Sequence, residues 1–243
     1  KRQKEVFDFV RQDPERLGIV PIENSSGGTI YDTLDRLADK SFGLIIREAL
    51  SIDVQLALLG KDKRNVSIIY SHFAPLYHCE DWLHINYPQA KLIAEPSTAA
   101  ALKKAAEESG TAAIGNRGAG ERYHLKVLEF PIQEDMPNVT QFFLLGHEVA
   151  PIDGACRMTV VVTLPNKSGA LVDFLEPFKG QGVNLTRIIS RPMFGKPEAY
   201  VFMVDIAGTE EDKGVKLALD QAKKVTTSIR NIGTYPVRPI YKS

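Results

Sequence analysis

Short apolar runs alternate with helical patterns from residue 17 to residue 130, and this alternation is the strongest constraint on the fold. The runs "LGIVPI" (17–22) and "NVSIIYS" (65–71) are rich in β-branched residues, which favour strands. Between them, "TIYDTLDRLAD" (29–39) has apolar residues at helical spacing. Strands that alternate with helices favour a largely parallel sheet covered by helices, so we predict an α/β fold for this part of the chain.

The alternation continues with further predicted elements, each read from the same periodicity. They are extended runs at 42–50 and 51–60, strands over 90–95 and 111–115, helices over 75–86 and 97–109, and a short helix within 116–125.

A breaker-rich segment, "EVAPIDGAC" (148–156), separates this alternation from a different pattern. The residues after it predict the order strand, helix, strand, strand, helix, strand, which is the ferredoxin-like arrangement. We therefore expect a first domain over 1–150 and a small α+β domain over 155–243.

Composition narrows the classes of partner. Thirty basic residues balance thirty acidic ones, so neither a nucleic acid nor an anionic membrane is expected. The two cysteines, Cys79 and Cys156, lie far apart and show no clustered Cys/His spacing, which gives no support for a zinc site or a disulfide framework. We interpret both as reduced thiols, which fits a cytoplasmic protein. No apolar run reaches the roughly 18 residues of a membrane helix.

Three clusters of small polar residues follow predicted strands and precede predicted helices. They are "PIENSSGGT" (21–29), "YSHFAP" (70–75) and "EPSTAAA" (95–101), the last with Ser97 or Thr98 as the predicted N-cap. Helix N-termini favour anions, and in open α/β sheets they line the ligand crevice. The three together predict a small polar acid as ligand, whereas each one alone is more simply explained as a helix cap. No GxxxxGK[ST] or GxGxxG motif supports nucleotide binding.

Two further segments carry possible sites. "NVTQFFLL" (138–145) reads as a strand with the hydroxyl of Thr140 near its start. "LPNKSGALVDFL" (164–175) places Gly169 between a strand and a helix, where glycine allows a ligand or a second subunit to approach closely. A plain turn followed by core residues explains that glycine equally well, and spacing does not choose between the two.

Together these segments resemble the prephenate dehydratase family over nearly the whole chain. Residues 18–37 are similar to its VPIENS segment, 71–83 to its SHPQAL segment, and "NVTQFFLLG" (138–146) to its N-x-T-R-F strand. "PSTAAA" (96–101) and "AAIGN" (112–116) match its later cleft segments. Residues 168–192 and 198–208 are similar to its C-terminal ACT domain, with the GALV and ESRP motifs.

The resemblance implies a fold like the type II periplasmic-binding proteins, followed by a ferredoxin-like ACT domain. The two α/β lobes would comprise roughly 1–50 plus 130–150, and 51–129. It implies decarboxylating dehydration of prephenate to phenylpyruvate in phenylalanine biosynthesis, without a metal or an organic cofactor. It also implies feedback inhibition by phenylalanine in a homodimer or homotetramer assembled through ACT domains.

Site residues carry over from the same motifs. Thr140 matches the threonine that protonates the leaving hydroxyl. The substrate-binding positions implied are Asn24, Ser25, Ser71, His72, Ser97, Thr98, Asn138, Gln141 and Phe142. The phenylalanine site implied comprises Asn166, Gly169, Ala170, Leu171, Asn184 and Leu185.

Four departures from the family pattern stand out. Gln141 replaces an arginine, and loss of a charged contact to substrate would cost about 1.5–3 kcal/mol, unless Arg117 or Arg122 compensates. Phe73 and Ala74 replace a proline and a glutamine, and Ile189 replaces the glutamate of ESRP, where phenylalanine control would be altered. The family's first strand and GTFS-like turn have no counterpart, so we expect the natural chain to begin earlier.

Two alternatives of other kinds stay open. One is a related enzyme, an arogenate dehydratase or a prephenate decarboxylase. The other is a catalytically silent amino-acid sensor that keeps the ACT ligand site. Some relatives also carry a fused chorismate mutase domain, which this sequence neither includes nor excludes.

Overall fold

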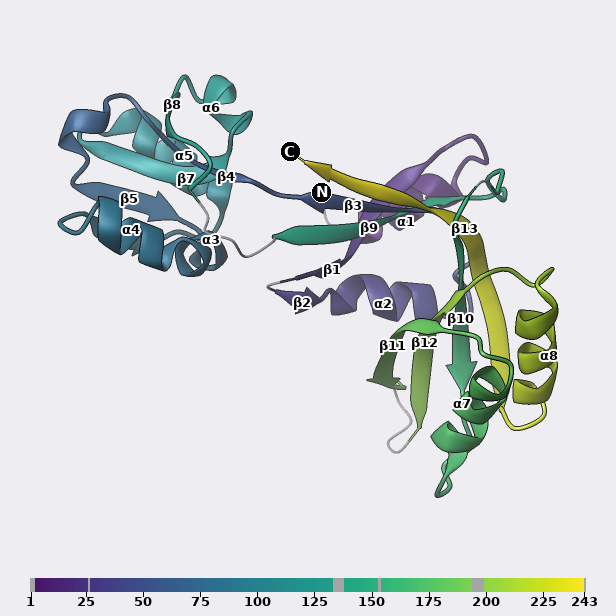
Figure 1. Cartoon of the computed structure of the whole chain (residues 1–243). Coiled ribbons are helices and arrows are strands. Elements are labelled where there is room, and N and C mark those ends of the chain that lie inside the picture. The colour runs from purple at the N-terminus through teal and green to yellow at the C-terminus, as the bar shows by residue number, and fades with distance from the viewer. Residues whose placement is uncertain (1–2, 26, 133–137, 153, 194–198, 243) are drawn as a thin grey trace. The chain divides into compact units, whose positions relative to one another are not determined.

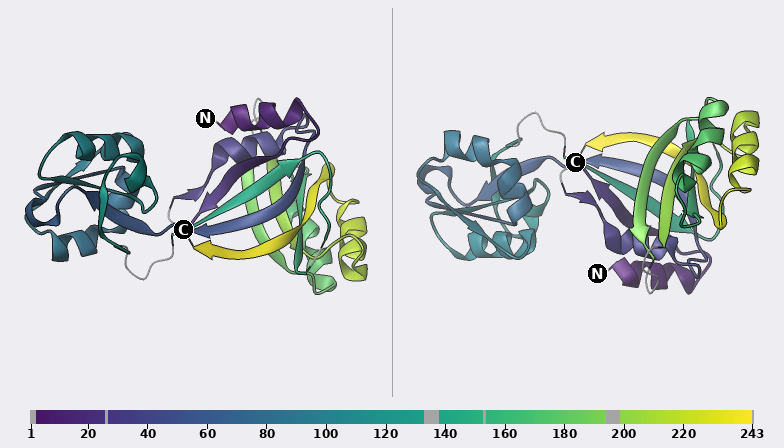
Figure 2. Two further views of the ribbon diagram at one scale, coloured as in Figure 1. Left: turned by 90° about the horizontal axis from the view of Figure 1, so that it is seen from above. Right: turned by 90° about the horizontal axis from the view of Figure 1, so that it is seen from below.

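A computed structural model describes residues 3–25, 27–132, 138–152, 154–193 and 199–242 (Figures 1 and 2). The chain divides into two compact units. The first comprises Lys1–Glu23, Thr29–Ser51 and Gln141–Pro239, and the second comprises Asn24–Gly28, Ile52–Thr140 and Ile240–Ser243.

The second unit is built on a five-stranded sheet among the described residues. In sheet order, its strands are β6 (Lys91–Ala94), β5 (Ile68–Ser71), β7 (Thr111–Asn116), β4 (Leu56–Gly60) and β8 (Lys126–Glu129). Its helices are η1 (Lys63–Asn65), α3 (Phe73–His78), α4 (Glu80–Asn86), α5 (Thr98–Glu107) and α6 (Ala119–Arg122). β5 pairs in parallel with β6 and β7, and β4 pairs antiparallel with β7 and β8. The predicted α/β class is confirmed.

Helices cover both faces of this sheet, so its central strands read as continuous apolar runs. Every residue of β4 is buried. Leu56 and Leu58 face a core that contains Leu83 of α4, whereas Ala57 and Leu59 face the core under α5. The alternation along one strand therefore divides the apolar residues between two helical layers.

The first unit contains an eight-stranded sheet among the described residues. In sheet order, its strands are β11 (Leu185–Pro192), β12 (Tyr200–Ala207), β10 (Cys156–Thr163), β13 (Ser228–Lys242), β3 (Ile45–Asp53), β9 (Val139–Gly146), β1 (Gly18–Asn24) and β2 (Gly28–Thr29). Its helices are α1 (Gln3–Arg11), α2 (Tyr31–Ala38), α7 (Ala170–Gly180) and α8 (Lys213–Ala222).

The C-terminal part has the predicted ferredoxin-like order. Its elements run β10, α7, β11, β12, α8, β13 along the chain, and its strands lie in the order β11-β12-β10-β13. α7 and α8 pack on one face, where Phe174, Phe178 and Leu219 are buried against Val160 and Val204 (Figures 1 and 2). The other face of the same sheet joins a core shared with α1 and α2, because Val161, Met203 and Tyr235 pack with Phe7 and Leu34.

β13 is longer than the sequence predicts. Its register with β10 runs from Ser228 to Pro236, and β3 is its other neighbour in the sheet (yellow in Figure 1). The sequence pattern shows an apolar strand but not its partners, so the continuation of one sheet across both parts is not visible in it.

Gly233 allows β13 and β3 to approach closely. A Cβ there would lie 2.5 Å from the carbonyl oxygen of Ile46 and 2.9 Å from its nitrogen. We expect Gly233→Ala to lower the free energy of unfolding by about 3 kcal/mol, because backbone must move to make room. Urea denaturation measures this, with Gly180→Ala as control, since a Cβ at Gly180 meets nothing within 4 Å. Equal stability of the two variants would contradict the role given to Gly233.

Some sequence predictions are wrong in detail. The first polar cluster does not cap a helix. Its described residues lie in β1, in β2 and between these two strands, and the residue before α2 is Ile30, without a side-chain cap. The helix predicted over 75–86 is two helices that meet at Cys79. α1 was not predicted. None of the helices in the described part of the chain is long and apolar enough to cross a membrane.

Candidate active site

Thr140 and Asn24 lie on neighbouring strands, β9 and β1, and are joined by a hydrogen bond. The Asn24 amide nitrogen Nδ2 donates to Thr140 Oγ1 over 2.8 Å and to Asn138 Oδ1 over 3.0 Å. Backbone bonding at Ser25 aligns the two strands: its N–H donates to the carbonyl of Val139 over 2.9 Å, and the Val139 N–H donates to Ser25 Oγ over 3.0 Å.

The orientation of the Asn24 amide is fixed from both ends. The N–H of Gly27 donates to Asn24 Oδ1 over 2.8 Å, so the NH₂ group faces Thr140 and Asn138. Asn138 is buried, and its own NH₂ donates to the carbonyl of Val54 over 3.3 Å. An amide that donates to two acceptors and accepts from a backbone N–H has little freedom to rotate. Asn24 therefore presents a fixed donor to the hydroxyl of Thr140.

This arrangement makes Thr140 able to act as a proton donor. Because Oγ1 already accepts from Asn24, its own proton can point to a further acceptor. A threonine hydroxyl is a weak acid, and a donor aimed at its oxygen stabilises the negative charge that develops as the proton leaves. The pair thus has the geometry of a polarised hydroxyl acid.

A second polar group lies at the carboxyl edge of the five-stranded sheet. β5 and β6 end there with Ser71 and Ala94, and the N–H of Glu95 donates to the carbonyl of Ser71 over 2.7 Å. Ser71 is buried, and its hydroxyl donates to the carbonyl of Ile114 over 3.4 Å. Ser97 is the N-cap of α5 and accepts from the N–H of Ala100 over 3.1 Å, as predicted.

Asn138 is bonded to the segment that precedes β4. Leu56, the first residue of β4, lies opposite Asn116, the last residue of β7, at this same carboxyl edge. Val54 is two residues earlier, so its Cα is at most about 7 Å from that of Leu56. Val54 N–H donates to the carbonyl of Asn138 over 2.9 Å. The backbone of Asn138 is therefore bonded to a residue two positions before β4 begins.

Charges at this edge are partly neutralised. Glu95 pairs with Lys104 over 2.6 Å, and that hydrogen bond raises the pKa of the lysine. Asn116 and Arg117 line a pocket of about 490 Å³ beyond the end of β7, and the Arg117 guanidinium lies 5.2 Å from the centre of the Phe130 ring. The edge thus offers helix N–H groups, hydroxyls and a nearby arginine to an anion.

β9 divides its predicted site residues between two faces. Successive strand residues point to opposite sides, so Thr140 and Phe142 share one face and Gln141 shares the other with Phe143 and Leu145. Phe143 and Leu145 are buried in the core, and Gln141 Oε1 accepts a hydrogen bond from Arg187. The side chain of Gln141 is therefore not on the face of Thr140.

In the structure, most of the residues predicted for catalysis and substrate binding form two separate groups. Asn24, Ser25, Asn138 and Thr140 form one hydrogen-bonded group. Ser71, His72, Ser97 and Thr98 lie at the sheet edge, with His72 as the N-cap of the short α3 and its ring 4.4 Å from that of Phe73. Ser26 lies outside the described residues. Two contributors were missed, the carbonyl of Val54 and the side chain of Arg187, because sequence shows neither a backbone acceptor nor a partner across the sheet.

Four of the residues predicted for phenylalanine lie at or just before the start of α7, namely Asn166, Gly169, Ala170 and Leu171. Asn184 and Leu185 follow the end of α7 and lie at the opposite edge of the sheet, where Leu185 is paired with Ile206 and Ile206 with Met158. Gly169 has a positive φ of 81° directly before the helix, a backbone conformation that favours glycine. Ala170, the first residue of α7, is buried, Leu171 and Asn166 are exposed, and the carbonyl of Asn184 accepts from the N–H of Ala207 over 2.9 Å. The glycine is therefore required by the turn, and its role toward a ligand stays a prediction.

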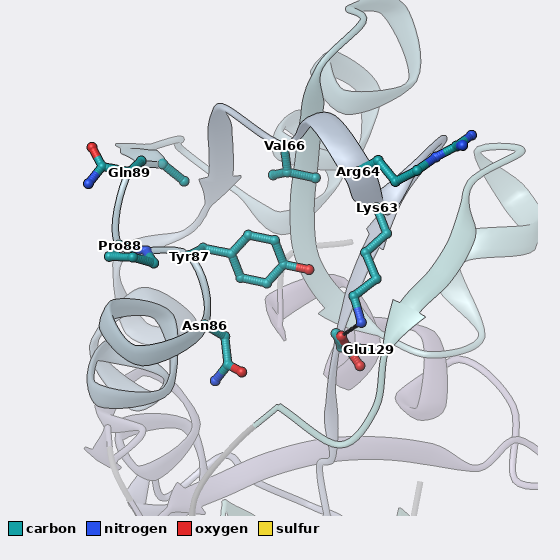
Figure 3. A pocket seen from close by; sticks show the side chains of 9 residues that line it. Lys63, Arg64, Val66, Asn86, Tyr87, Pro88, Gln89 and Glu129 are labelled. Atoms are coloured by element: carbon teal, nitrogen blue, oxygen red, sulfur yellow. Dashed lines mark ion pairs between the residues drawn. The ribbon is translucent and has the colours of Figure 1, made fainter.

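A pocket of about 490 Å³ lies at the opposite, amino edge of the five-stranded sheet (Figure 3). Figure 3 shows the Tyr87 ring pointing toward the ion pair of Lys63 and Glu129. Burial raises the pKa of the Tyr87 hydroxyl. Val66 and Ala90, which line this pocket, precede β5 and β6, so it is separated by the length of those strands from Ser71.

Comparison with known proteins identifies the family. The family profile described as prephenate dehydratase matches residues 1–150, more than half of the chain, and the ACT domain profile matches 158–223. The chain belongs to the prephenate dehydratase family. Both parts of the sequence resemblance are thereby confirmed.

Relatives within the prephenate dehydratase family are similar over almost all of this chain. A bifunctional chorismate mutase/prephenate dehydratase of Pseudomonas aeruginosa is 32% identical over 234 residues, which cover 96% of this chain and 64% of the relative. The chain thus spans somewhat less than two thirds of that protein. A prephenate dehydratase from Arthrobacter aurescens, solved in complex with L-Phe, is 30% identical with a TM-score of 0.84, covering 97% of this chain and 79% of that one. The Staphylococcus aureus enzyme is 26% identical with a TM-score of 0.83, covering 97% and 88%.

Proposed function

We propose that this chain is a prephenate dehydratase, which converts prephenate into phenylpyruvate, water and carbon dioxide. The observation that carries the proposal is the hydrogen bond from Asn24 to Thr140 Oγ1, held by Asn138, in a member of the prephenate dehydratase family. Family membership supplies the reaction, and the hydrogen bond supplies a polarised hydroxyl at the position where that reaction needs an acid.

The reaction needs one proton and no redox step. The ring carboxylate leaves as carbon dioxide, its electron pair enters the ring, and the bond from the ring carbon to the hydroxyl oxygen breaks. Thr140 gives its proton to the departing oxygen, which leaves as water, and Thr140 is reprotonated from solvent. The Asn24 amide stabilises the charge on Oγ1 during the transfer, and acid help of this kind contributes about 10²–10⁴-fold to the rate.

Prephenate carries two carboxylates, and the sheet edge suits such a ligand. We propose that Ser71, His72, Ser97 and Thr98 bind it there, since the ten-residue helix α5 offers free N–H groups and the positive end of its dipole. Asn24, Ser25, Asn138 and Phe142 would contact the substrate around Thr140. Gln141 was also predicted to bind substrate, but its side chain lies on the other face of β9, where it accepts from Arg187.

The test is an assay with purified protein and prephenate, with the product identified by mass. Phenylpyruvate formed well above the spontaneous rate supports the proposal. Arogenate as the better substrate, or a decarboxylated product that retains the hydroxyl, would identify one of the related enzymes instead. No turnover of either substrate, together with thermal stabilisation by phenylalanine, would identify an amino-acid sensor.

Regulation and assembly are proposed on the same basis. We propose a catalytic domain over 1–150, with lobes of roughly 1–50 plus 130–150 and 51–129, followed by an ACT domain over 155–243. Phenylalanine would bind at Asn166, Gly169, Ala170, Leu171, Asn184 and Leu185 and inhibit the enzyme. The protein would be cytoplasmic, as suits amino-acid biosynthesis, and a homodimer or homotetramer through its ACT domains. A solution mass equal to one chain would contradict the assembly.

Gly169→Val should abolish the rise in melting temperature that phenylalanine causes, because the side chain would fill the approach to α7. The positive φ of this residue also makes the variant less stable, by roughly 1 kcal/mol or more. Gly154→Val is the matched control: its φ of 69° carries similar strain, and it lies outside the proposed site. A phenylalanine shift that survives in Gly169→Val would count against the site, and its loss in both variants would mean that strain alone is responsible.

A further inference from the structure

Arg187 of β11 reaches from the C-terminal domain to the strands that carry the Thr140 group. Its side chain is only 10% exposed. Nη2 lies 3.2 Å from Glu23 Oε2 and donates to Gln141 Oε1, and Nη1 lies 3.2 Å from Asp205 Oδ2. The guanidinium carbon is 5.7 Å from the centre of the Phe143 ring. One guanidinium therefore contacts β12, β9 and β1 at once.

A buried carboxylate fixes this guanidinium. Asp205 is 1% exposed; its Oδ1 accepts from the Thr159 hydroxyl over 2.7 Å, and the Thr159 oxygen lies 2.7 Å from the buried Tyr235 hydroxyl. Burial raises the pKa of Asp205, and the Arg187 charge acts in the opposite direction. Because a buried charge is costly without its partner, the core of the C-terminal domain determines where the guanidinium lies.

The residues that Arg187 contacts are the chain neighbours of the hydrogen-bonded pair. Gln141 directly follows Thr140, and Glu23 directly precedes Asn24. The guanidinium thus holds β9 and β1 one residue away from the two partners of the Asn24–Thr140 hydrogen bond. Glutamine suits this position, since its amide oxygen accepts from Arg187, whereas an arginine at 141 would offer no acceptor.

We propose that Arg187, acting through Gln141 and Glu23, is a positioning residue that sets the alignment of Thr140 with Asn24 and couples the C-terminal domain to the acid. The proposal deepens the proposed function and depends on it for its catalytic consequence. In this proposal Gln141 holds β9 in place and does not bind a substrate carboxylate. This role explains physically why glutamine stands at a position where the family has arginine.

Steady-state kinetics on two variants with limited side-chain changes test whether Arg187 and Gln141 affect turnover. Arg187→Lys keeps the charge but loses the planar fork, and Gln141→Leu removes only the acceptor. Each should lower kcat about tenfold while KM for prephenate stays within about twofold, because neither side chain touches substrate. The double variant should be no slower than the slower single one, since both changes break one contact.

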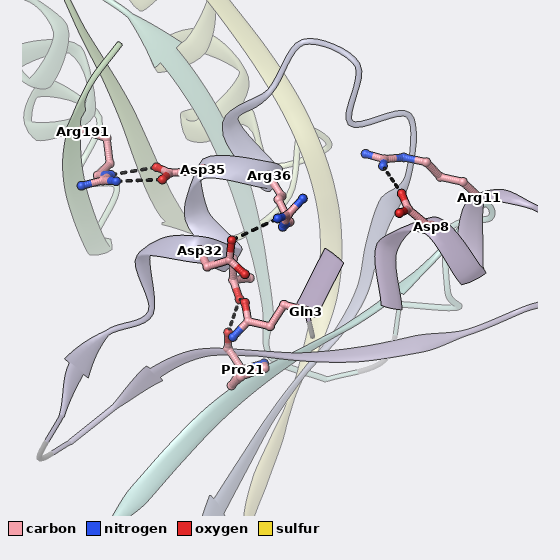
Figure 4. Close-up of polar contacts among 9 residues, drawn as sticks. Gln3, Asp8, Arg11, Pro21, Asp32, Asp35, Arg36 and Arg191 are labelled. Carbon is pink, nitrogen blue, oxygen red and sulfur yellow. Dashed lines mark hydrogen bonds and ion pairs between the residues drawn. The ribbon is translucent and has the colours of Figure 1, made fainter. Parts of the chain in front are cut away.

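Arg191→Lys is the matched control, with the same substitution on the same strand. Arg191 lies four residues along β11 on the same face and donates to Asp35 of α2 over 2.8 and 2.7 Å. Figure 4 shows this pair. That pair is more exposed than the Arg187 contacts, since the Arg191 side chain is 32% exposed and that of Asp35 is 52% exposed. Its kcat should stay within about twofold of the wild type.

Hydrogen–deuterium exchange provides a readout that does not require turnover. Amides over 138–146 should exchange several-fold faster in Arg187→Lys and Gln141→Leu than in the wild type and in Arg191→Lys. Unchanged exchange in both variants, or kcat within twofold of the wild type, would overturn the proposal. A wild type that does not dehydrate prephenate would sink the proposed function, and the exchange result would still decide whether Arg187 holds β9.

Discussion

Thr140→Val should lower kcat by about 10²-fold or more, the low end of what general acid catalysis contributes. Valine has nearly the shape of threonine and favours strands equally well, so β9 keeps its place while the proton donor is lost. KM for prephenate should change little, because the hydroxyl acts on the bond that breaks. Initial rates of phenylpyruvate formation measure the effect.

Thr140→Ser provides the control, because it restores a hydroxyl at the same carbon and should recover most of the rate. Asn24→Asp tests whether Thr140 donates a proton or only contacts the substrate. Aspartate cannot donate to Thr140 Oγ1 when ionised, and its charge opposes loss of a proton from the hydroxyl. It should therefore be slower than the wild type by at least about tenfold. Full activity in Thr140→Val would remove the acid role from this residue.

The sequence predicts the fold where periodicity alone decides it. The ferredoxin-like order of the C-terminal part and the α/β alternation of the first part both follow from apolar spacing, and Ser97 is the cap that its position predicts. The first polar cluster was misread because Ser, Asn and Gly favour turns as strongly as caps. Only pairing between β1 and β2 distinguishes the two, and pairing is not local.

The sequence predicts which residues belong to the candidate site, but not which groups they contact. Motif similarity identifies Thr140 and Asn24 as site residues. The orientation of the Asn24 amide, however, depends on Asn138, which in turn donates to the carbonyl of Val54. No sequence pattern predicts a backbone acceptor that lies 84 residues away along the chain. Gln141 shows the same limit. Adjacency to Thr140 indicated a shared role at the substrate, whereas strand geometry turns the two side chains to opposite faces.

Arg187→Met should lower the free energy of unfolding by about 3–5 kcal/mol at neutral pH, the cost of leaving a buried carboxylate without its partner. Asp205 is the carboxylate that loses its charged partner in this variant. It is 1% accessible to solvent, and its other contact, the Thr159 hydroxyl, is uncharged. Arg157, Glu23 and Tyr235 are the titratable or charged groups that also act on it. Urea denaturation followed by circular dichroism measures the change.

The pKa of Asp205 determines how the loss of stability in Arg187→Met changes with pH. The pKa of Asp205 is already raised by burial, and Arg187 opposes that shift, so removing Arg187 raises it further. A carboxyl whose pKa is higher in the folded than in the unfolded state contributes full stability below the unfolded value, and loses it as pH rises through the folded value. The deficit of Arg187→Met should therefore grow as the pH rises above the ordinary pKa of an aspartate.

Two further variants decide whether the buried charge is the cause. Asp205→Asn added to Arg187→Met removes the unpaired charge, so it should restore much of the stability and abolish the growth of the deficit with pH. Arg191→Met breaks an ion pair whose aspartate is 52% exposed, and it should cost less than about 1 kcal/mol. If Arg187→Met were no less stable than Arg191→Met, Asp205 would not need this guanidinium, and the C-terminal domain would have no fixed charge with which to hold β9.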